Sequence, residues 1–160
     1  MSLQHAGPFL VFAEEAHEES ADLLFMPDAT ASDWATVFNH AEVLHIGAGL
    51  ALVQAGEDDR ALYLLTEGTV GVRLPRDEGA FKQIDAPSVV GELAFLDGRP
   101  RSATLDAVTD IEVVRLDQKG FERLSEDAPE LARTMLLDLG RILALRLRMA
   151  SEVIAQLRSA

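Results

Sequence analysis

No cysteine occurs among the 160 residues, which excludes disulfide bonds and thiolate metal sites and fits a reducing compartment. No apolar run approaches the ~20 residues that cross a membrane as a helix. The short apolar stretch 8–12 has no basic residue before it, which argues against a secretory signal. We therefore expect a cytoplasmic chain that does not enter a membrane.

Basic residues are also unevenly distributed along the chain. Residues 1–59 contain eleven Asp and Glu but no Lys or Arg, whereas the rest of the chain holds 16 acidic and 14 basic residues. The net charge of −13 disfavours nucleic acid and anionic membranes as partners. Residues 60–160 are nevertheless close to neutral, so an anion-binding arginine there is not offset by a strongly acidic background.

Motifs of enzymes and metal sites are missing as well. His17 and Glu18 begin like the HExxH zinc-protease pattern, but Ala21 stands where the second histidine is needed. The chain has neither a GxSxG nucleophile elbow nor a GxxxxGK phosphate loop. We therefore expect no catalytic residue, no metal and no cofactor.

At this length, and with 48% hydrophobic residues, the chain is predicted to fold around a single core. Residues 1–31 are predicted to form an acidic helical leader, with a helix from about Glu14 to Phe25 that ends at Pro27. This leader is either a solvated face or a docking surface for a basic partner.

A short helix is predicted next, capped by Ser32, with an apolar face of Trp34, Val37, Phe38 and Ala41. The apolar period then changes towards two, in short runs separated by glycines, which indicates a β-sandwich or β-barrel. The expected strand segments include 81–85, 89–90, 103–108 and 111–116. The fold class is therefore mainly β with flanking helices.

The residues best suited to binding a ligand lie in the stretch 90–104, VGELAFLDGRPRSAT. Residues 93–96 can form one helical turn, and a helix N-terminus presents unpaired N–H groups to an anion. Arg101 brings a guanidinium whose planar fork suits phosphate oxygens. Glu92, when ionised, only accepts hydrogen bonds, so it suits the hydroxyls of a sugar. A phosphate beside a hydroxylated sugar indicates a nucleotide.

This stretch resembles the phosphate-binding cassette of cyclic nucleotide-binding domains, which occur in catabolite-activator-type regulators, cyclic-nucleotide-dependent kinases and gated channels. GELA, the GxPR turn and RSAT fit that cassette without a gap. The stretch 49–72 is similar to the family's first strands, so the resemblance covers about residues 32–157. It implies a jelly-roll β-barrel at residues 32–128 with its cassette at 90–104, followed by a lid or dimerisation helix at 129–160.

The resemblance also implies ligand-binding residues, beginning with Gly91 at the start of the cassette. The cyclic phosphate would bind the backbone amides of Leu93 and Ala94, together with Arg101 and the Ser102 hydroxyl. Glu92 would accept from the ribose 2′-hydroxyl, and the base would lie under a lid near Leu147 and Arg148. Val90 stands where many family members have an aromatic residue.

Helical periodicity returns after Asp117, which can cap a short helix. Pro129 is predicted to open a long helix that ends near Arg158. That helix has two apolar stripes. One is formed by Leu139, Ile142, Leu145, Met149 and Val153. The other is formed by Leu136, Leu143, Ala150 and Leu157, which repeat every seven residues, with Gly140, Leu147 and Ile154 offset by four. One stripe can cover the barrel, and the second, with its seven-residue repeat, favours a homodimer. A single broad face on the barrel is the alternative.

We therefore expect a regulatory sensor domain that binds cyclic AMP in modest preference to cyclic GMP and acts through its last helix on a protein effector. No helix-turn-helix follows that helix, so DNA is not expected as a partner. One alternative is a ligand-independent dimerisation or interaction scaffold with the same fold. A second is a small-molecule enzyme on a β-barrel.

Overall fold

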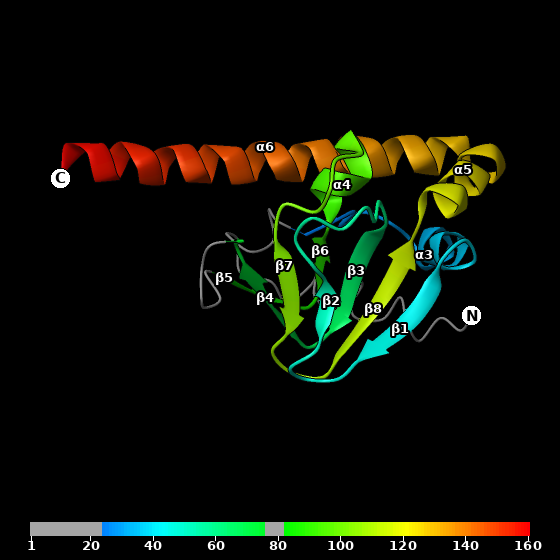
Figure 1. Ribbon diagram of the computed structural model, residues 1–160. Helices are drawn as coiled ribbons and strands as arrows, with labels where there is room; N and C mark the ends of the chain where they lie inside the picture. The colour runs from blue at the N-terminus through cyan, green and yellow to red at the C-terminus, as the bar shows by residue number, and fades with distance from the viewer. Residues whose placement is uncertain (1–23, 76–81) are drawn as a thin grey trace.

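The computed structural model describes residues 24–75 and 82–160, and its strands form two four-stranded antiparallel sheets (Figure 1). The first sheet has the order β1 (Glu42–Ile46), β8 (Ile111–Leu116), β3 (Leu62–Glu67) and β6 (Ser88–Val90). The second has the order β2 (Ala51–Val53), β7 (Thr104–Ala107), β4 (Thr69–Arg73) and β5 (Lys82–Asp85). Two facing antiparallel sheets are one form of the jelly roll, so the predicted mainly β class is confirmed.

Strand β3 of the first sheet is buried on both faces. Leu62 and Leu64 join a core cluster under the helices, whereas Tyr63 and Leu65 join a second cluster between the sheets. Successive side chains of a strand point to opposite faces, so an apolar run can fill two cores at once. The second cluster draws residues from both sheets, and its members Val53, Val90 and Leu105 also line a pocket.

Helix α3 (Ala31–Phe38) covers one end of the first sheet. Its N-cap is Thr30 rather than the predicted Ser32, because Thr30 and Asp33 form a reciprocal capping box. Ser32 lies two residues further on and cannot pair with Asp33 in this way. The apolar face predicted for this helix is present, with Trp34, Val37 and Phe38 all buried.

Most of the predicted acidic helix, residues 14–23, lies outside the described residues. Its last two residues, Leu24 and Phe25, are described and are not helical, and Met26 has a left-handed backbone with φ 52°. The predicted strand 81–85 begins at Lys82 in the structure, and Phe81 also lies outside the described residues.

Helices α5 (Gln118–Asp127) and α6 (Pro129–Ser159) follow the last strand, as predicted. Asp117 caps α5 by accepting from the Gly120 N–H at 2.7 Å, and Pro129 opens α6. Helix α6 runs over the sheets and continues past them (Figure 1). Its buried residues are Ala132, Met135, Leu139 and Ile142, so its body-facing stripe ends at the middle of the helix. None of the helices in the described residues is long and apolar enough to cross a membrane.

Candidate functional site

The cassette begins at a glycine that no other residue can replace without strain. Gly91 has φ 75°, in the left-handed region, and precedes the short helix α4 (Glu92–Asp97), which ends at Gly98. A Cβ at Gly91 would lie 2.6 Å from the Arg101 Nη1 and 3.3 Å from the ring of Tyr63. The glycine therefore both starts α4 and leaves room for the arginine that returns behind it.

Arg101 is buried, and backbone and side-chain groups of the same chain hold its guanidinium in place. Its Nη1 donates to the Gly91 carbonyl at 2.8 Å, and its Nη2 donates to the Ala61 carbonyl at 2.7 Å and to Asp59 at 3.0 Å. Its guanidinium carbon also lies 5.5 Å from the centroid of the Tyr63 ring. These contacts fix the position of the guanidinium plane before any ligand arrives.

Arginine carries five N–H donors, and three of those on Arg101 are taken by these contacts. The Nε of Arg101 is fully buried and has no hydrogen-bond partner within residues 24–75 and 82–160. An unpaired buried donor is costly, so a side chain that keeps one in a folded protein calls for an explanation. One explanation is that a ligand supplies the acceptor.

Asp59 is the carboxylate that holds Arg101, and sequence reasoning did not identify it. Burial alone would raise the pKa of Asp59, but hydrogen bonds from Tyr63, the Ala61 N–H and Arg101 outweigh it and lower this pKa from 3.8 to about 2. Burial and the hydrogen bond to Asp59 raise the pKa of Tyr63 to about 12. The carboxylate is therefore ionised, and the phenol neutral, over the whole physiological pH range.

Glu92 is paired with a residue of α6. Its Oε1 accepts from the Arg146 Nη1 at 2.5 Å, and the Arg146 Nη2 donates to the Val89 carbonyl at 3.2 Å. Arg146 was also missed by the sequence analysis. The signal for it is its position: it follows Ile142 by four residues and so continues the buried stripe of the helix.

These residues surround a pocket of about 140 Å³. All six residues predicted to bind the ligand line it, namely Gly91, Glu92, Leu93, Ala94, Arg101 and Ser102. Neither Leu147 nor Arg148, the predicted lid, is in the described lining, and Arg146 takes that place. The reason is geometric, because each helical residue is rotated by ~100° from the one before it, so Leu147, which is 68% exposed, points away.

The far wall of the pocket is apolar, formed by Val53, Val72, Ile84, Val90 and Leu105. The charged residues of the described lining are Glu92, Arg101 and Arg146, which gives a net charge of one positive unit. A ligand with one negative charge and a flat apolar part would match both features. No group of three or more metal-ligating side chains gathers in the described parts of the chain.

The cassette also contacts α5. The Gln118 side chain donates to the Phe95 carbonyl at 3.0 Å, and the rings of Phe95 and Phe121 meet edge-on with centroids 5.4 Å apart. The helices that follow the sheets therefore hold both ends of α4. Helix α6 contacts its start, and helix α5 contacts its end.

A larger pocket, of about 520 Å³, lies between α3 and the start of α6. Its described lining includes the carboxylates of Asp28, Asp33, Glu130 and Asp138 but no lysine or arginine. Such a lining repels an anion, so the smaller pocket is the better candidate for a phosphate ligand.

Two facing sheets around a pocket with an anchored arginine, a net positive lining and an apolar wall define a domain that binds a small anionic ligand. The comparison with known families gives a match to the cyclic nucleotide-binding domain over residues 43–128. The chain belongs to the cyclic nucleotide-binding domain family.

Relatives at the sequence level include a cAMP-dependent protein kinase regulatory subunit of Aspergillus fumigatus, 32% identical over 62% of this chain and 24% of the relative. A cyclic nucleotide-gated potassium channel of Rhizobium etli is 32% identical over 56% of this chain and 24% of the relative. The chain thus spans about a quarter of the length of the curated relatives it matches.

Among solved structures, a cyclic nucleotide-binding domain from Methylobacillus flagellatus matches with a TM-score of 0.78 and 19% identity. The match covers 96% of this chain and 84% of that one. It supports the fold, including the helices that flank the sheets.

Proposed function

We propose that this chain is a regulatory domain that binds a cyclic nucleotide in the pocket between α4 and the second sheet. The cyclic phosphate contacts the backbone amides of Leu93 and Ala94, the Ser102 hydroxyl and the free donors of Arg101. Glu92 accepts from the ribose hydroxyl through its second oxygen. The proposal includes no chemical step, in keeping with the names of the relatives, a kinase regulatory subunit and a cyclic nucleotide-gated channel.

The buried Nε of Arg101 carries this proposal. A purely structural arginine in this position would satisfy its donors within the protein, whereas this one has no partner for Nε among the described residues. A phosphodiester oxygen supplies the missing acceptor and one negative charge.

Cyclic AMP is the proposed ligand, and cyclic GMP is the alternative. The base would lie on the apolar wall, which suits adenine better than the more polar edge of guanine. Ser102 adds a hydroxyl at the mouth of the pocket, and one hydrogen bond of this kind is worth about 0.5–1.5 kcal/mol. Ser102 alone therefore changes the ratio of the affinities for cyclic AMP and cyclic GMP by about tenfold at most.

The proposed response runs through α6, because Glu92 is shared between ligand and helix. Arg146 holds one oxygen of Glu92 and also the Val89 carbonyl, so the position of α6 affects the group that receives the ribose. A ligand that prefers one arrangement of α6 shifts the population towards it by its differential affinity.

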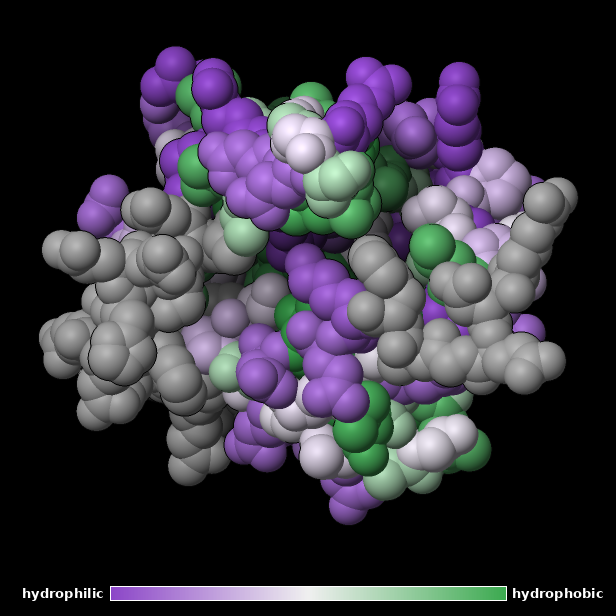
Figure 2. Space-filling model, turned by 90° about the vertical axis from the view of Figure 1, so that its left-hand side faces the viewer, coloured by the Kyte–Doolittle hydropathy of each residue, from purple (hydrophilic) through white to green (hydrophobic). Residues whose placement is uncertain are grey.

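Homodimerisation through α6 is also proposed. The second apolar stripe is unburied beyond the sheets, where Leu147, Ile154 and Leu157 are all more than half exposed. Figure 2 looks onto this end of the molecule and shows apolar and hydrophilic side chains around the projecting helix. A second copy of the same helix would cover the apolar ones. A protein effector and a cytoplasmic location remain predictions from the sequence.

Calorimetric titration with cyclic AMP and cyclic GMP tests the proposal. We expect one site per chain, with tighter binding of cyclic AMP and a similar preference in Ser102→Ala. Tighter binding of cyclic GMP that is lost in Ser102→Ala would reverse the proposed preference. A folded chain that binds neither nucleotide would instead favour the ligand-independent scaffold.

A further inference from the structure

Ser102 is an exposed serine that lines the pocket of about 140 Å³, which we call the nucleotide pocket. Residues 98–103 belong to neither a helix nor a strand. Within residues 24–75 and 82–160, the Ser102 hydroxyl forms no hydrogen bond. A hydroxyl that is exposed, unpaired and outside regular secondary structure is open to covalent modification by another enzyme.

The residues before Ser102 have a charge pattern that suits recognition by a protein kinase. In the sequence RPRS, Arg99 stands three residues before the serine and Arg101 stands one residue before it. Arg99 is exposed, and its guanidinium has no partner in the described parts of the chain, whereas Arg101 is buried. Charge patterns of this kind contribute to the specificity of kinases for their substrates. Arg99 is therefore available to the acidic binding site of an arginine-directed kinase.

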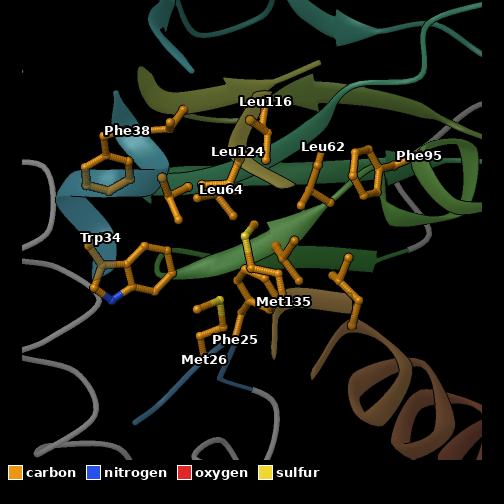
Figure 3. Close-up of a cluster of buried hydrophobic side chains, with 14 of the residues drawn as sticks. Phe25, Met26, Trp34, Phe38, Leu62, Leu64, Phe95, Leu116, Leu124 and Met135 are labelled. Atoms are coloured by element: carbon orange, nitrogen blue, oxygen red, sulfur yellow. The ribbon is translucent and has the colours of Figure 1, made fainter. Parts of the chain in front are cut away.

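The chain around Ser102 is fixed, so a group attached to its side chain stays beside the nucleotide pocket. The Arg101 N–H donates to the Glu57 carbonyl at 2.9 Å, and the Gly56 N–H donates to the Arg101 carbonyl at 2.8 Å. Earlier in the cassette, Phe95 is 4% exposed and belongs to the core cluster that Figure 3 shows. The segment between these anchors cannot carry Ser102 away from the pocket without breaking one of them.

A phosphoryl group on Ser102 would occupy the position proposed for the cyclic phosphate. In the proposed function, a phosphate oxygen lies within hydrogen-bond distance of the Ser102 Oγ, about 2.5–3.0 Å. No room is then left for a phosphorus atom bonded to the same Oγ. Phosphoserine also carries a charge of about −1.5 to −2 near pH 7, which repels the negative charge of a cyclic nucleotide. The unpaired Nε of Arg101 can thus serve one phosphate group or the other, but not both.

We propose that Ser102 is a phosphorylation site for an arginine-directed protein kinase, and that phosphoserine at this position blocks the nucleotide pocket. The block rests on the proposed function. In the phosphorylation step, the Ser102 Oγ forms a bond to the γ-phosphorus of ATP while the bond from that phosphorus to the bridging oxygen breaks. ADP leaves, and the hydroxyl proton passes to a base of the kinase. A bound nucleotide covers Ser102 in turn, so binding and phosphorylation compete.

Phosphorylation of the unaltered chain tests the modification. The chain is incubated with ATP and a protein kinase that selects arginine three residues before serine, and tandem mass spectrometry locates the phosphate. We expect phosphate on Ser102, at a rate about tenfold or more lower in Arg99→Ala, the effect of losing one hydrogen bond to a charged group. Arg123→Ala removes the same charge from an exposed position of α5 and should leave the rate unchanged. Absence of phosphate on Ser102, or equal rates in the two variants, would overturn the modification.

Replacement of Ser102 by phosphoserine during translation tests the block. Calorimetric titration of this chain should show no binding at cyclic AMP concentrations that saturate the parent. Replacement of Ser32 by phosphoserine is the matched control, because Ser32 is exposed and outside the described pocket lining, and this chain should bind as the parent does. Equal affinity of the two phosphorylated chains would overturn the block.

The same two experiments separate this inference from the proposed function. Saturating cyclic AMP should slow phosphorylation of Ser102 in the parent, and an unchanged rate in a chain that binds the nucleotide would overturn the competition. A parent chain that binds neither cyclic AMP nor cyclic GMP would overturn the proposed function and the block with it. Phosphorylation of Ser102 that depends on Arg99 would still establish the modification in that case.

Discussion

Glu92 and Arg146 form an ion pair at 2.5 Å, although 54 residues separate them in the chain. Glu92 starts the cassette helix, and Arg146 lies where the buried stripe of α6 ends. Because Arg146 also binds the Val89 carbonyl, it holds both the strand that enters the cassette and the helix that follows. This contact connects the pocket with the rest of α6.

Arg146→Gln should lower the free energy of unfolding by about 1–3 kcal/mol, because it leaves the largely buried Glu92 carboxylate without its charged partner. Arg148→Gln is the matched control, since Arg148 lies on the exposed side of the same helix. Urea unfolding of both variants measures the difference. Equal stability of the two would show that the ion pair does not hold α6.

Asp59→Asn should make the free energy of unfolding depend less on pH in the acid range. The folded pKa of Asp59, about 2, lies below its ordinary 3.8. Its contribution to stability is therefore complete above about pH 4 and is lost as the pH falls from 3.8 towards 2. Unfolding free energies measured across this range should fall more steeply for the parent than for Asp59→Asn. Parallel curves would contradict the hydrogen bonding described for this carboxylate.

Gly91→Ala should lower stability by about 1–3 kcal/mol, because the left-handed backbone disfavours a side chain and the new Cβ meets Arg101 at 2.6 Å. Gly140→Ala provides the contrast, since no atom lies within 4 Å of its added Cβ. In a helix interior that change should stabilise by up to about 1 kcal/mol. Denaturant unfolding measures whether each variant is less or more stable than the parent. A Gly91→Ala variant as stable as the parent would contradict the close approach of Arg101.

The proposed dimer should dissociate when charge enters the second apolar stripe of α6. Leu143→Asp combined with Leu157→Asp should give a monomer by light scattering with an unchanged far-ultraviolet dichroism spectrum. Leu137→Asp is the control, because Leu137 is 66% exposed but lies outside the stripe. A parent chain that is monomeric at tens of micromolar would refute the dimer.

Features that depend on neighbouring residues could be predicted from the sequence. Asp117 caps α5 and Pro129 opens α6, as predicted, each through chemistry within a few residues. The cap of α3 was missed by two residues, because Thr30 and Ser32 are chemically similar. Only the capping box with Asp33 decides between them.

Contacts between distant segments could not be predicted in the same way. Asp59 reaches Arg101 across 42 residues, and its place is set by the turn before β3 rather than by a local pattern. For a related reason, the residue of α6 that lines the pocket, Arg146, differs from the predicted lid residues Leu147 and Arg148. An apolar pattern shows which stripe faces the body, but not which residue of that stripe meets the cassette. Arg146 reveals its role only when α6 is placed against Glu92.

Calorimetric titration of Arg101→Ala with cyclic AMP tests the central claim most directly. Loss of one partner of a buried charge pair costs about 3–5 kcal/mol, or roughly two to three and a half decades in affinity. We predict this loss for Arg101→Ala and only partial recovery in Arg101→Lys, which keeps the charge but lacks the planar fork. Circular dichroism has to show that each variant is folded, because Arg101 also anchors Asp59 and the Ala61 carbonyl. A folded Arg101→Ala chain that binds cyclic AMP as tightly as the parent would contradict the account.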